Sequence, residues 1–254
     1  MLILLPPSEG KAAKGDGPPV DLDALSFPAL TSAREKVIDA LTAVAHGPRG
    51  EALAVLGLTP GQAGELDLDR ALRTARTLPA ARLYTGVLYD NLGIASLDAA
   101  ARRRANRSVI VFSGLWGALR LRDRVPPYRL SMGVRLPPLG GLAAHWRPAL
   151  TGALDAERGL IVDLRSSTYA AAWRPPSQAV TVRVLREADG ARSVVSHMAK
   201  ATRGTVARSL LECGASPRSP RALAGLLADL GHTAELGPPP RAGEPWTVDI
   251  VVNS

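Results

Sequence analysis

Apolar runs and helical periodicity alternate along this chain, and this alternation predicts an α/β protein. Aliphatic and β-branched runs bounded by Gly, Pro or charged residues predict buried strands at residues 1–5, 109–113, 159–165, 179–186, 193–197 and 246–252. A hairpin over 188–190 joins the fourth and fifth of these runs. We therefore expect a mixed α+β fold, in which a central mixed sheet is flanked by helices.

Apolar residues that recur every three or four positions predict helices at residues 31–45, 67–77, 96–107, 141–154, 197–213 and 220–230. Ser32 and Glu35 have the spacing of a capping box in the first helix, and Ser96 is expected to cap the third. Residues 53–66 predict two short helices joined by a tight turn. We expect a single compact domain over residues 1–254, with residues 31–80 as a helical lobe inserted after the first strand.

Composition is that of a globular chain of 254 residues, 46% of them hydrophobic. No apolar run approaches the roughly 20 residues that span a bilayer, so we expect no membrane segment. The opening MLILL is too short for a signal peptide and reads as the start of a strand. Because the single cysteine, Cys213, has no internal partner, a cytoplasmic location is expected.

The formal net charge of +8 favours polyanionic partners. Almost all of the positive charge is arginine, however, and the chain is rich in Ala, Gly and Pro. This combination suggests a compositional bias of the source genome. The net charge is therefore weaker evidence for a polyanionic partner. The arginines of 102–107 fit either the negative end of a helix dipole or a nucleic-acid patch.

Chemistry-bearing residues follow several predicted strands, where open α/β sheets tend to bind ligands. Ser8 and Lys11 lie in a Gly-containing loop after the first strand, which is either an anion site or a mobile surface loop. Arg129 follows a rigid Pro-Pro pair, residues 163–169 form a hydroxyl-rich corner, and residues 197–203 begin a basic helix. These segments predict one shared polar cleft.

The turn at residues 57–61 is similar to a helix-hairpin-helix, in which a Gly-apolar-Gly hairpin presents backbone amides to a nucleic-acid phosphate. Gly57 and Gly61 flank Thr59, which stands where the second Gly is usual. The other interpretation is an ordinary joint between two helices.

Several motifs together resemble the peroxide-stress protein YaaA family. They are ordered as in that family and span nearly the whole chain: MLILL-PPSEGK at the N-terminus, YTG at 84–86, SGLWGALR at 113–120, PPYRLSMGVRL at 126–136, VDLRSSTY at 162–169 and MAKATRG at 198–204. The resemblance implies a mixed α/β fold with a helix-hairpin-helix element, binding of double-stranded DNA, and a role in limiting iron-dependent damage under hydrogen peroxide.

The resemblance also implies a shared pocket, lined by Lys11, Tyr84, Ser113, Arg129, Asp163, Ser166, Tyr169, Lys200 and Arg203. A concave polar cluster of this kind looks like an active site, so a second hypothesis is an enzyme acting on a small anionic, nucleobase-like or nucleotide-like molecule. In it, Arg129, Lys200 and Arg203 would bind the anion and Asp163 would be the acid/base.

His197 is a candidate general base, or a metal or haem ligand, although a lone histidine is more often structural. The four histidines show no metal-ligand spacing, so no dedicated metal site is predicted. Whether the protein uses iron or haem stays open from the sequence alone.

Overall fold

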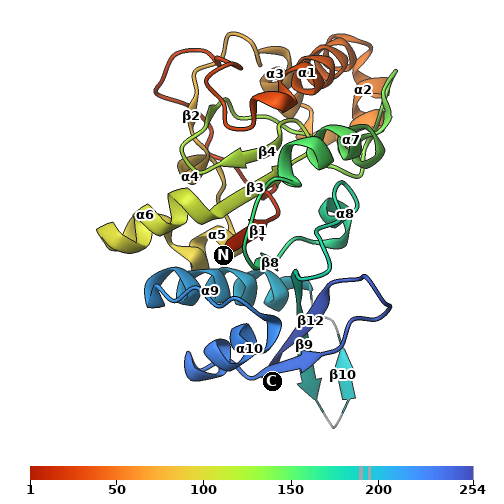
Figure 1. Cartoon of the computed structure of the whole chain (residues 1–254). Helices are drawn as coiled ribbons and strands as arrows, with labels where there is room; N and C mark the ends of the chain where they lie inside the picture. Colours follow the sequence, from red (N-terminus) through yellow and green to blue (C-terminus); the bar gives the residue numbers. More distant parts are fainter. Residues whose placement is uncertain (189–190, 194–195, 254) are drawn as a thin grey trace.

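An eight-stranded sheet forms the centre of the computed structural model, which describes residues 1–188, 191–193 and 196–253. Seven strands follow the order β11-β12-β9-β8-β1-β3-β4, and β10 pairs with β9 (Figure 1). The strands are β1 (Leu2–Leu5), β3 (Val109–Ser113), β4 (Gly117–Arg120), β8 (Ile161–Asp163), β9 (Val180–Ala188), β10 (Ala191–Ser193), β11 (Ala234–Gly237) and β12 (Trp246–Asn253). The predicted mixed α/β fold with a central mixed sheet is therefore confirmed.

The order of the strands reverses at β1. The chain passes from β1 to its parallel neighbour β3 on one side, and later returns to β8, also parallel, on the other. Ile3 pairs with Val109 on β3 and with Val162 on β8. Such a reversal leaves a crevice outside the carboxyl ends of the strands, where ligands bind in open α/β sheets.

The central strands β1 and β3 are almost entirely apolar because both faces of the sheet are covered. All four residues of β1 are buried, as are all five of β3. A strand buried on both faces shows a continuous apolar run and no alternation, which explains why the apolar runs predict nearly correct bounds for these two strands.

Helices and short strands lie in the segments that connect the strands of the central sheet. The α-helices are α1 (Thr31–His46), α2 (Arg49–Leu56), α3 (Glu65–Arg70), α4 (Ala80–Leu83), α5 (Val87–Leu92), α6 (Ala99–Ser108), α7 (Leu142–Leu154), α8 (Ser167–Ala170), α9 (Ser196–Cys213) and α10 (Pro220–Asp229). The 3-10 turns are η1 (Pro28–Leu30), η2 (Pro60–Gln62) and η3 (Ile94–Ser96), and the short strands are β2 (Leu78–Pro79), β5 (Arg124–Val125), β6 (Arg135–Leu136) and β7 (Gly140–Gly141). Figure 1 shows α1, α2 and α3 grouped at one end and α9 and α10 at the other.

Two predicted helix caps and one predicted helix boundary are wrong. The 3-10 turn η1 leads directly into α1, so no side chain caps that helix and the predicted capping box is absent there. The predicted helix 67–77 ends at Arg70. Asp98, not Ser96, caps α6, because its carboxylate accepts the Ala101 N–H at 2.7 Å.

The predicted strand 193–197 is also wrong, since β10 ends at Ser193 and α9 has begun by Ser196. β10 does pair antiparallel with β9, as the predicted hairpin requires. Residues 189–190 of that hairpin lie outside the described residues.

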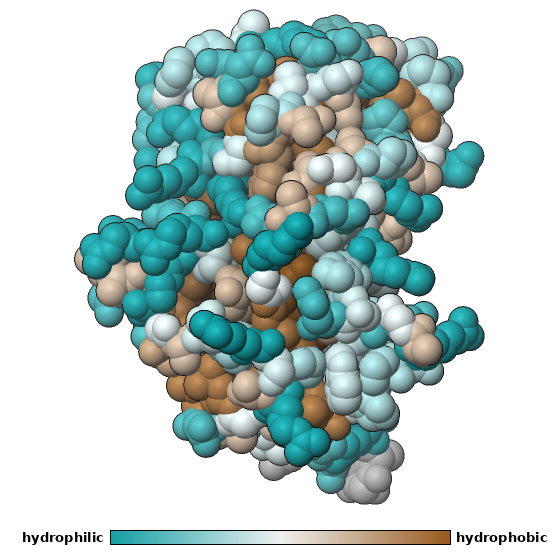
Figure 2. Space-filling model, in the orientation of Figure 1, coloured by the Kyte–Doolittle hydropathy of each residue, from teal (hydrophilic) through white to brown (hydrophobic). Residues whose placement is uncertain are grey.

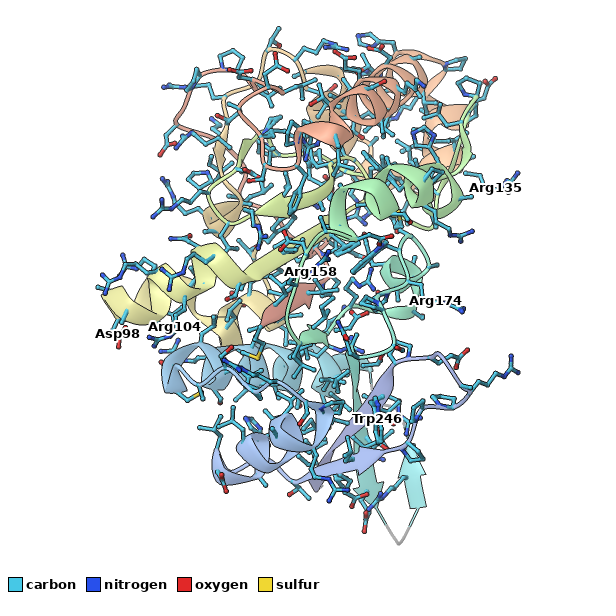
Figure 3. The ribbon with its side chains drawn as sticks, viewed as in Figure 1. Asp98, Arg104, Arg135, Arg158, Arg174 and Trp246 are labelled. Atoms are coloured by element: carbon cyan, nitrogen blue, oxygen red, sulfur yellow. The ribbon has the colours of Figure 1, made fainter. Side chains whose placement is uncertain are left out.

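Arg104 links α6 to α9 near the surface. Its Nε donates to the Leu211 carbonyl at 2.6 Å and its Nη2 to the Glu212 carbonyl at 3.0 Å, whereas Arg135 and Arg174 project away from the body (Figure 3). Hydrophilic residues cover most of the face in Figure 2, where apolar residues form separate patches. Within the part of the chain that the structure describes, no helix is long and apolar enough to cross a membrane.

Candidate functional site

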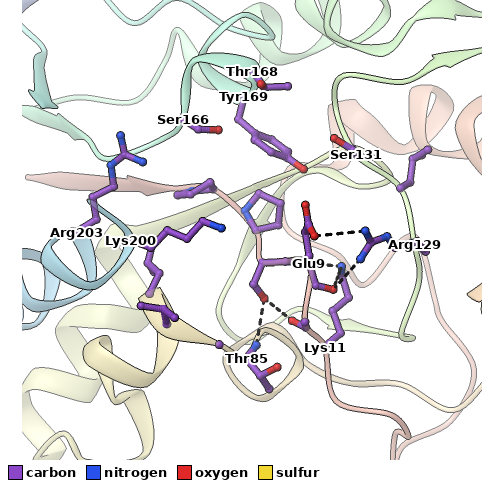
Figure 4. A pocket seen from close by; sticks show the side chains of 18 residues that line it. Glu9, Lys11, Thr85, Arg129, Ser131, Ser166, Thr168, Tyr169, Lys200 and Arg203 are labelled. Carbon is purple, nitrogen blue, oxygen red and sulfur yellow. Dashed lines mark hydrogen bonds and ion pairs between the residues drawn. The ribbon is translucent and has the colours of Figure 1, made fainter. Parts of the chain in front are cut away.

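A cleft of about 360 Å³ opens beside the carboxyl ends of β1 and β8, at the point where the strand order reverses. Its walls come from five separate parts of the chain: the loop after β1, the start of α5, the Arg129 segment, the loop after β8, and the first turns of α9 (Figure 4). The lining residues are Pro6–Lys11, Thr85–Leu88, Arg129–Ser131, Ser166, Thr168, Tyr169, Lys200 and Arg203.

The loop after β1 is fixed against the chain around Thr85. The Thr85 N–H lies 3.2 Å from Ser8 Oγ and 3.1 Å from the Gly10 carbonyl. Lys11 forms an isolated antiparallel bridge with Tyr84, and the Ala12 N–H donates to the Leu83 carbonyl at 2.8 Å. These bonds hold the Ser8–Lys11 backbone in one position, as a binding loop requires.

The Lys11 amine lies at the inner end of this loop. Its Nζ donates to the Ser8 carbonyl at 2.9 Å and lies 4.5 Å from the centre of the Tyr128 ring. Burial, and secondly the charge of Arg129, lower the pKa of Lys11 to about 8. A substantial fraction of this amine is therefore neutral near physiological pH.

Tyr84 and Ser113, which the resemblance placed in the pocket, lie beneath it and do not line it. Their hydroxyls meet at Tyr128: the Ser113 Oγ is 2.7 Å and the Tyr84 OH is 3.1 Å from the Tyr128 OH. Ser113 Oγ also accepts the N–H groups of Leu115 and Trp116 at 3.1 and 3.0 Å. Burial raises the pKa of Tyr84 and of Tyr128, so both phenols stay protonated and the network positions the aromatic floor under Lys11.

Arg129 reaches the cleft because Gly114 allows two backbone segments to approach closely. A Cβ on Gly114 would lie 2.9 Å from the Leu130 carbonyl oxygen and 3.0 Å from the Met132 nitrogen. The Arg129 guanidinium faces Glu9, with 3.4 Å between Nη2 and Oε2. Since the Glu9 side chain is 84% exposed, this long ion pair contributes little and can exchange for a bound anion.

Asp69, at the end of α3, holds the Arg129 segment from behind. Its Oδ1 accepts the Arg129 N–H at 2.8 Å, while its Oδ2 is buried without a hydrogen-bond partner in the described structure. Burial raises the pKa of this carboxyl to about 8. Sequence reasoning missed Asp69, since nothing in the surrounding pattern marks it as a buried acid.

The first turns of α9 bring Lys200 and Arg203 to the opposite wall, because Gly204 lets this helix pack closely on α5. A Cβ at Gly204 would lie 2.2 Å from the Leu88 carbonyl oxygen. Lys200 is exposed in the cleft. Burial lowers the pKa of Arg203, and its Nε is buried without a partner among the described residues.

The loop after β8 contributes hydroxyl groups. Ser166, Thr168 and Tyr169 line the cleft, and Figure 4 shows Tyr169 and Lys200 entering it from different sides. Burial raises the pKa of Tyr169, whose hydroxyl interacts with Ser131 and the Met132 backbone. Tyr169 is therefore a neutral proton donor at physiological pH.

Asp163 occupies a different place from the one expected of an acid/base. Arg165 donates to both of its oxygens, from Nε at 2.8 Å and from Nη2 at 2.6 Å, and both side chains are buried. Asp163 is not among the cleft residues. One residue separates Asp163 from Arg165 at the end of β8, and alternate side chains of a strand point to the same side of the sheet. This spacing in the sequence could have predicted the ion pair.

Positive charge dominates the cleft. Among the described residues, four cationic side chains line it, namely Lys11, Arg129, Lys200 and Arg203, against one carboxylate, Glu9. The His197 side chain, a candidate from the sequence, lies outside the described part of the structure. The described residues contain no group of three or more His, Cys, Asp or Glu that could hold a metal ion.

A second cleft of about 400 Å³ adjoins the first through the Glu9–Lys11 segment. It is lined by Glu9–Ala13, Gly61, Gln62, Gly64, Glu65, Leu68, Pro127 and Tyr128. Lys11 lines both clefts, so this residue lies where they adjoin.

The turn between α2 and α3 has the expected order of helix, turn and helix, but three of its amides, those of Gly57, Leu58 and Thr59, are occupied. Gly57 is left-handed, with φ of 66°, and its N–H donates to the Ala54 carbonyl. The Leu58 N–H donates to the Leu53 carbonyl at 2.8 Å and the Thr59 N–H to Gln62 Oε1 at 3.0 Å. A phosphate-binding hairpin would need such amides free, so the helix-hairpin-helix stays a prediction.

The charge around this turn is negative. Residues 50–69 contain four acidic residues, Glu51, Glu65, Asp67 and Asp69, and no lysine or arginine. Gly61 lines the second cleft, and Thr59 and Gln62 form a capping box at η2. Negative charge next to the turn disfavours contact with nucleic-acid phosphates.

Comparison with known proteins places this chain in a family. A family model described as peroxide stress protein YaaA matches residues 1–231. A UPF0246 protein of Streptomyces coelicolor is 51% identical over 259 residues, which cover 100% of this chain and 99% of the relative. A UPF0246 protein of Corynebacterium efficiens is 42% identical over 257 residues, covering 99% of this chain and 100% of the relative. The chain therefore belongs to the peroxide stress protein YaaA family.

Proposed function

We propose that this member of the peroxide stress protein YaaA family binds a small phosphate-bearing, nucleotide-like ligand in the cleft beside β1 and β8. The observation that carries the proposal is the convergence of Arg129, Lys200, Arg203 and Lys11 on one concave surface that holds a single, exposed carboxylate. A phosphate dianion would offset part of this excess charge and displace Glu9 from Arg129.

Size and polarity agree with this ligand class. A cleft of about 360 Å³ falls in the lower part of the range for small-molecule sites. Ser8, Ser131 and Tyr169 add hydroxyl groups to its walls, and the buried Nε of Arg203 is a donor without an acceptor among the described residues. Such a donor costs free energy unless a ligand accepts its hydrogen bond.

Acid/base chemistry on the bound ligand is a further part of the proposal. Tyr169 supplies a protonated hydroxyl and Lys11 an amine with a pKa of about 8, so both a proton donor and a proton acceptor border the cleft. Asp163 is better placed as the partner that orients Arg165, because both of its oxygens accept hydrogen bonds from that guanidinium.

Calorimetric titration of the full chain with AMP and with adenosine tests the proposal. We expect AMP to bind at least about tenfold more tightly than adenosine, the effect of one charge-assisted phosphate contact, and the difference to shrink as salt is raised. Equal affinities for the two compounds, or no binding of either, would refute a phosphate site.

Binding of double-stranded DNA and protection from iron-dependent damage are the second candidate function, suggested by the family. The net charge of +8, most of it arginine, favours it through salt-dependent contacts to phosphate, and the family resemblance assigns such contacts to the turn between α2 and α3. Thr59→Ala/Gln62→Ala would disturb this turn without changing charge. If the variant binds duplex DNA as well as the wild type at several salt concentrations, the turn is not the DNA site.

A further inference from the structure

Lys11 is a half-buried lysine with no acidic partner. Its Nζ donates to the Ser8 carbonyl at 2.9 Å and approaches the Glu9 carbonyl at 3.4 Å. Among the described residues, no carboxylate oxygen lies close enough to Lys11 Nζ, within 4.0 Å, to form an ion pair with it. A lysine buried without a counter-ion is costly as an ammonium, so another role for the amine has to be considered.

Two aromatic rings and a backbone bridge position the Lys11 amine. The Tyr128 ring lies beneath it at 4.5 Å and the Tyr84 ring at 5.9 Å, and the backbone bridge to Tyr84 holds the residue in place. The remaining side is open, since Lys11 lines both clefts. A ligand that enters either cleft therefore meets a positioned nitrogen.

The surrounding charges shift the pKa of Lys11 in both directions. Burial and the Arg129 guanidinium lower the pKa of Lys11 to about 8, while Glu65, Asp69 and Glu9 oppose them at longer range. The face of the Tyr128 ring also favours the ammonium form. Burial and a neighbouring cation are the combination that activates nucleophilic lysines.

We propose that Lys11 is a nucleophile, which condenses with the carbonyl group of a phosphorylated aldehyde or ketone held in the cleft. The inference rests on the proposed function, because Arg129, Lys200 and Arg203 would hold the phosphate. The neutral amine adds to the carbonyl carbon and a proton passes from nitrogen to oxygen, which gives a carbinolamine. Loss of water then forms the imine, with no change of oxidation state.

The composition of the chain makes this proposal easy to test. There are only four lysines, Lys11, Lys14, Lys36 and Lys200. The last three are exposed, and Lys11 alone is half-buried. Accessibility by itself would favour modification of the other three, so preferential reaction at Lys11 has to come from its chemistry.

Two probes separate the amine from the anion site: pyridoxal 5′-phosphate, and pyridoxal, which lacks the phosphate. Each is added to the full chain at pH 7.5, the imine is reduced with borohydride, and the modified lysines are quantified by peptide mass spectrometry. We expect the initial rate at Lys11 to exceed those at Lys14 and Lys36 by about tenfold or more with both probes, because its lowered pKa leaves more free amine. The phosphorylated probe should react at lower concentration.

Each other outcome has one meaning. Equal rates at Lys11, Lys14 and Lys36 would overturn the nucleophile. Modification of Lys200 in place of Lys11 would overturn it too, while leaving a phosphate site intact. Preferential reaction of Lys11 that needs the same concentration of both probes would keep the nucleophile and argue against the phosphate-binding function.

A matched pair of variants provides an independent readout. Lys11→Arg keeps the charge and removes the nucleophile, and Lys14→Arg makes the same change on the exposed part of the loop. We expect the imine absorbance with pyridoxal 5′-phosphate to be lost in the first variant and retained in the second. Circular dichroism establishes that both are folded, and full absorbance in folded Lys11→Arg would contradict the proposal.

Discussion

The main-chain N–H of Arg129 donates a 2.8 Å hydrogen bond to Oδ1 of Asp69, although 60 positions separate the two residues. This bond joins α3, at the end of the molecule where α1, α2 and α3 are grouped, to the segment that carries the cleft cation Arg129. The other carboxyl oxygen of Asp69 is buried without a partner in the described structure. The connection is therefore made at a cost in electrostatic free energy.

Replacing Asp69 by Asn should remove that cost and keep the acceptor. The carboxyl has an ordinary pKa of 3.8 and a folded-state pKa of about 8. The folded state then binds more protons than the unfolded state between these values, so the free energy of unfolding falls as pH rises from about 4 to 8. Urea unfolding at pH 5 and pH 8 should give a flatter dependence for Asp69→Asn, and a stability gain of about 1–3 kcal/mol at pH 8. Parallel pH profiles would contradict this assignment.

Gly204 should be intolerant of any side chain. A Cβ there would lie 2.2 Å from the Leu88 carbonyl oxygen and 2.9 Å from Asn91 Cβ. Gly204→Ala should push α9 from α5 and lower the free energy of unfolding by about 1–3 kcal/mol. Gly225→Ala in α10 is the matched control, since a Cβ at Gly225 would meet no atom within 4 Å, and it should be neutral or stabilising by up to about 1 kcal/mol. Equal effects of the two would refute the close approach.

Arg165 should be a major determinant of stability. Arg165→Met leaves the buried Asp163 carboxylate without its partner, which costs about 3–5 kcal/mol of the free energy of unfolding. Arg73 forms an ion pair of similar length with Asp39 but both side chains are more than half exposed, so Arg73→Met should cost less than about 1 kcal/mol. Chemical denaturation measures both, and a small loss for Arg165→Met would return Asp163 to the list of candidate acids.

The local pattern of apolar residues in the sequence was sufficient to predict the central strands and insufficient to predict the site. β1 and β3 follow from apolar runs, because burial on both faces leaves no other composition. In the structure, Ser8, Lys11, Arg129, Ser166, Tyr169, Lys200 and Arg203 line one cleft, and their role in binding stays a prediction. Strand ends on one sheet edge have to meet, whichever helices connect them.

The missed features depend on partners that are distant in sequence. Asp69 reads as an ordinary helix residue until Arg129 is packed against it. Ser96 and Asp98 are equally good caps by composition, but Asp98 caps α6 and the Ser96 hydroxyl donates to the Gly93 carbonyl. Strands β4 and β11 are short and at the edges of the sheet, where the apolar signal is weak.

The phosphate cleft is tested most directly by titrating AMP into the wild type and into Lys200→Ala/Arg203→Ala. Each cation should contribute about tenfold in affinity, so the double variant is expected to bind AMP about 100-fold more weakly. Arg103→Ala/Arg107→Ala, on the exposed side of α6, removes the same charge elsewhere and should bind as the wild type does. An unchanged affinity in Lys200→Ala/Arg203→Ala, or an equal loss in both double variants, would contradict the cleft as the site of function.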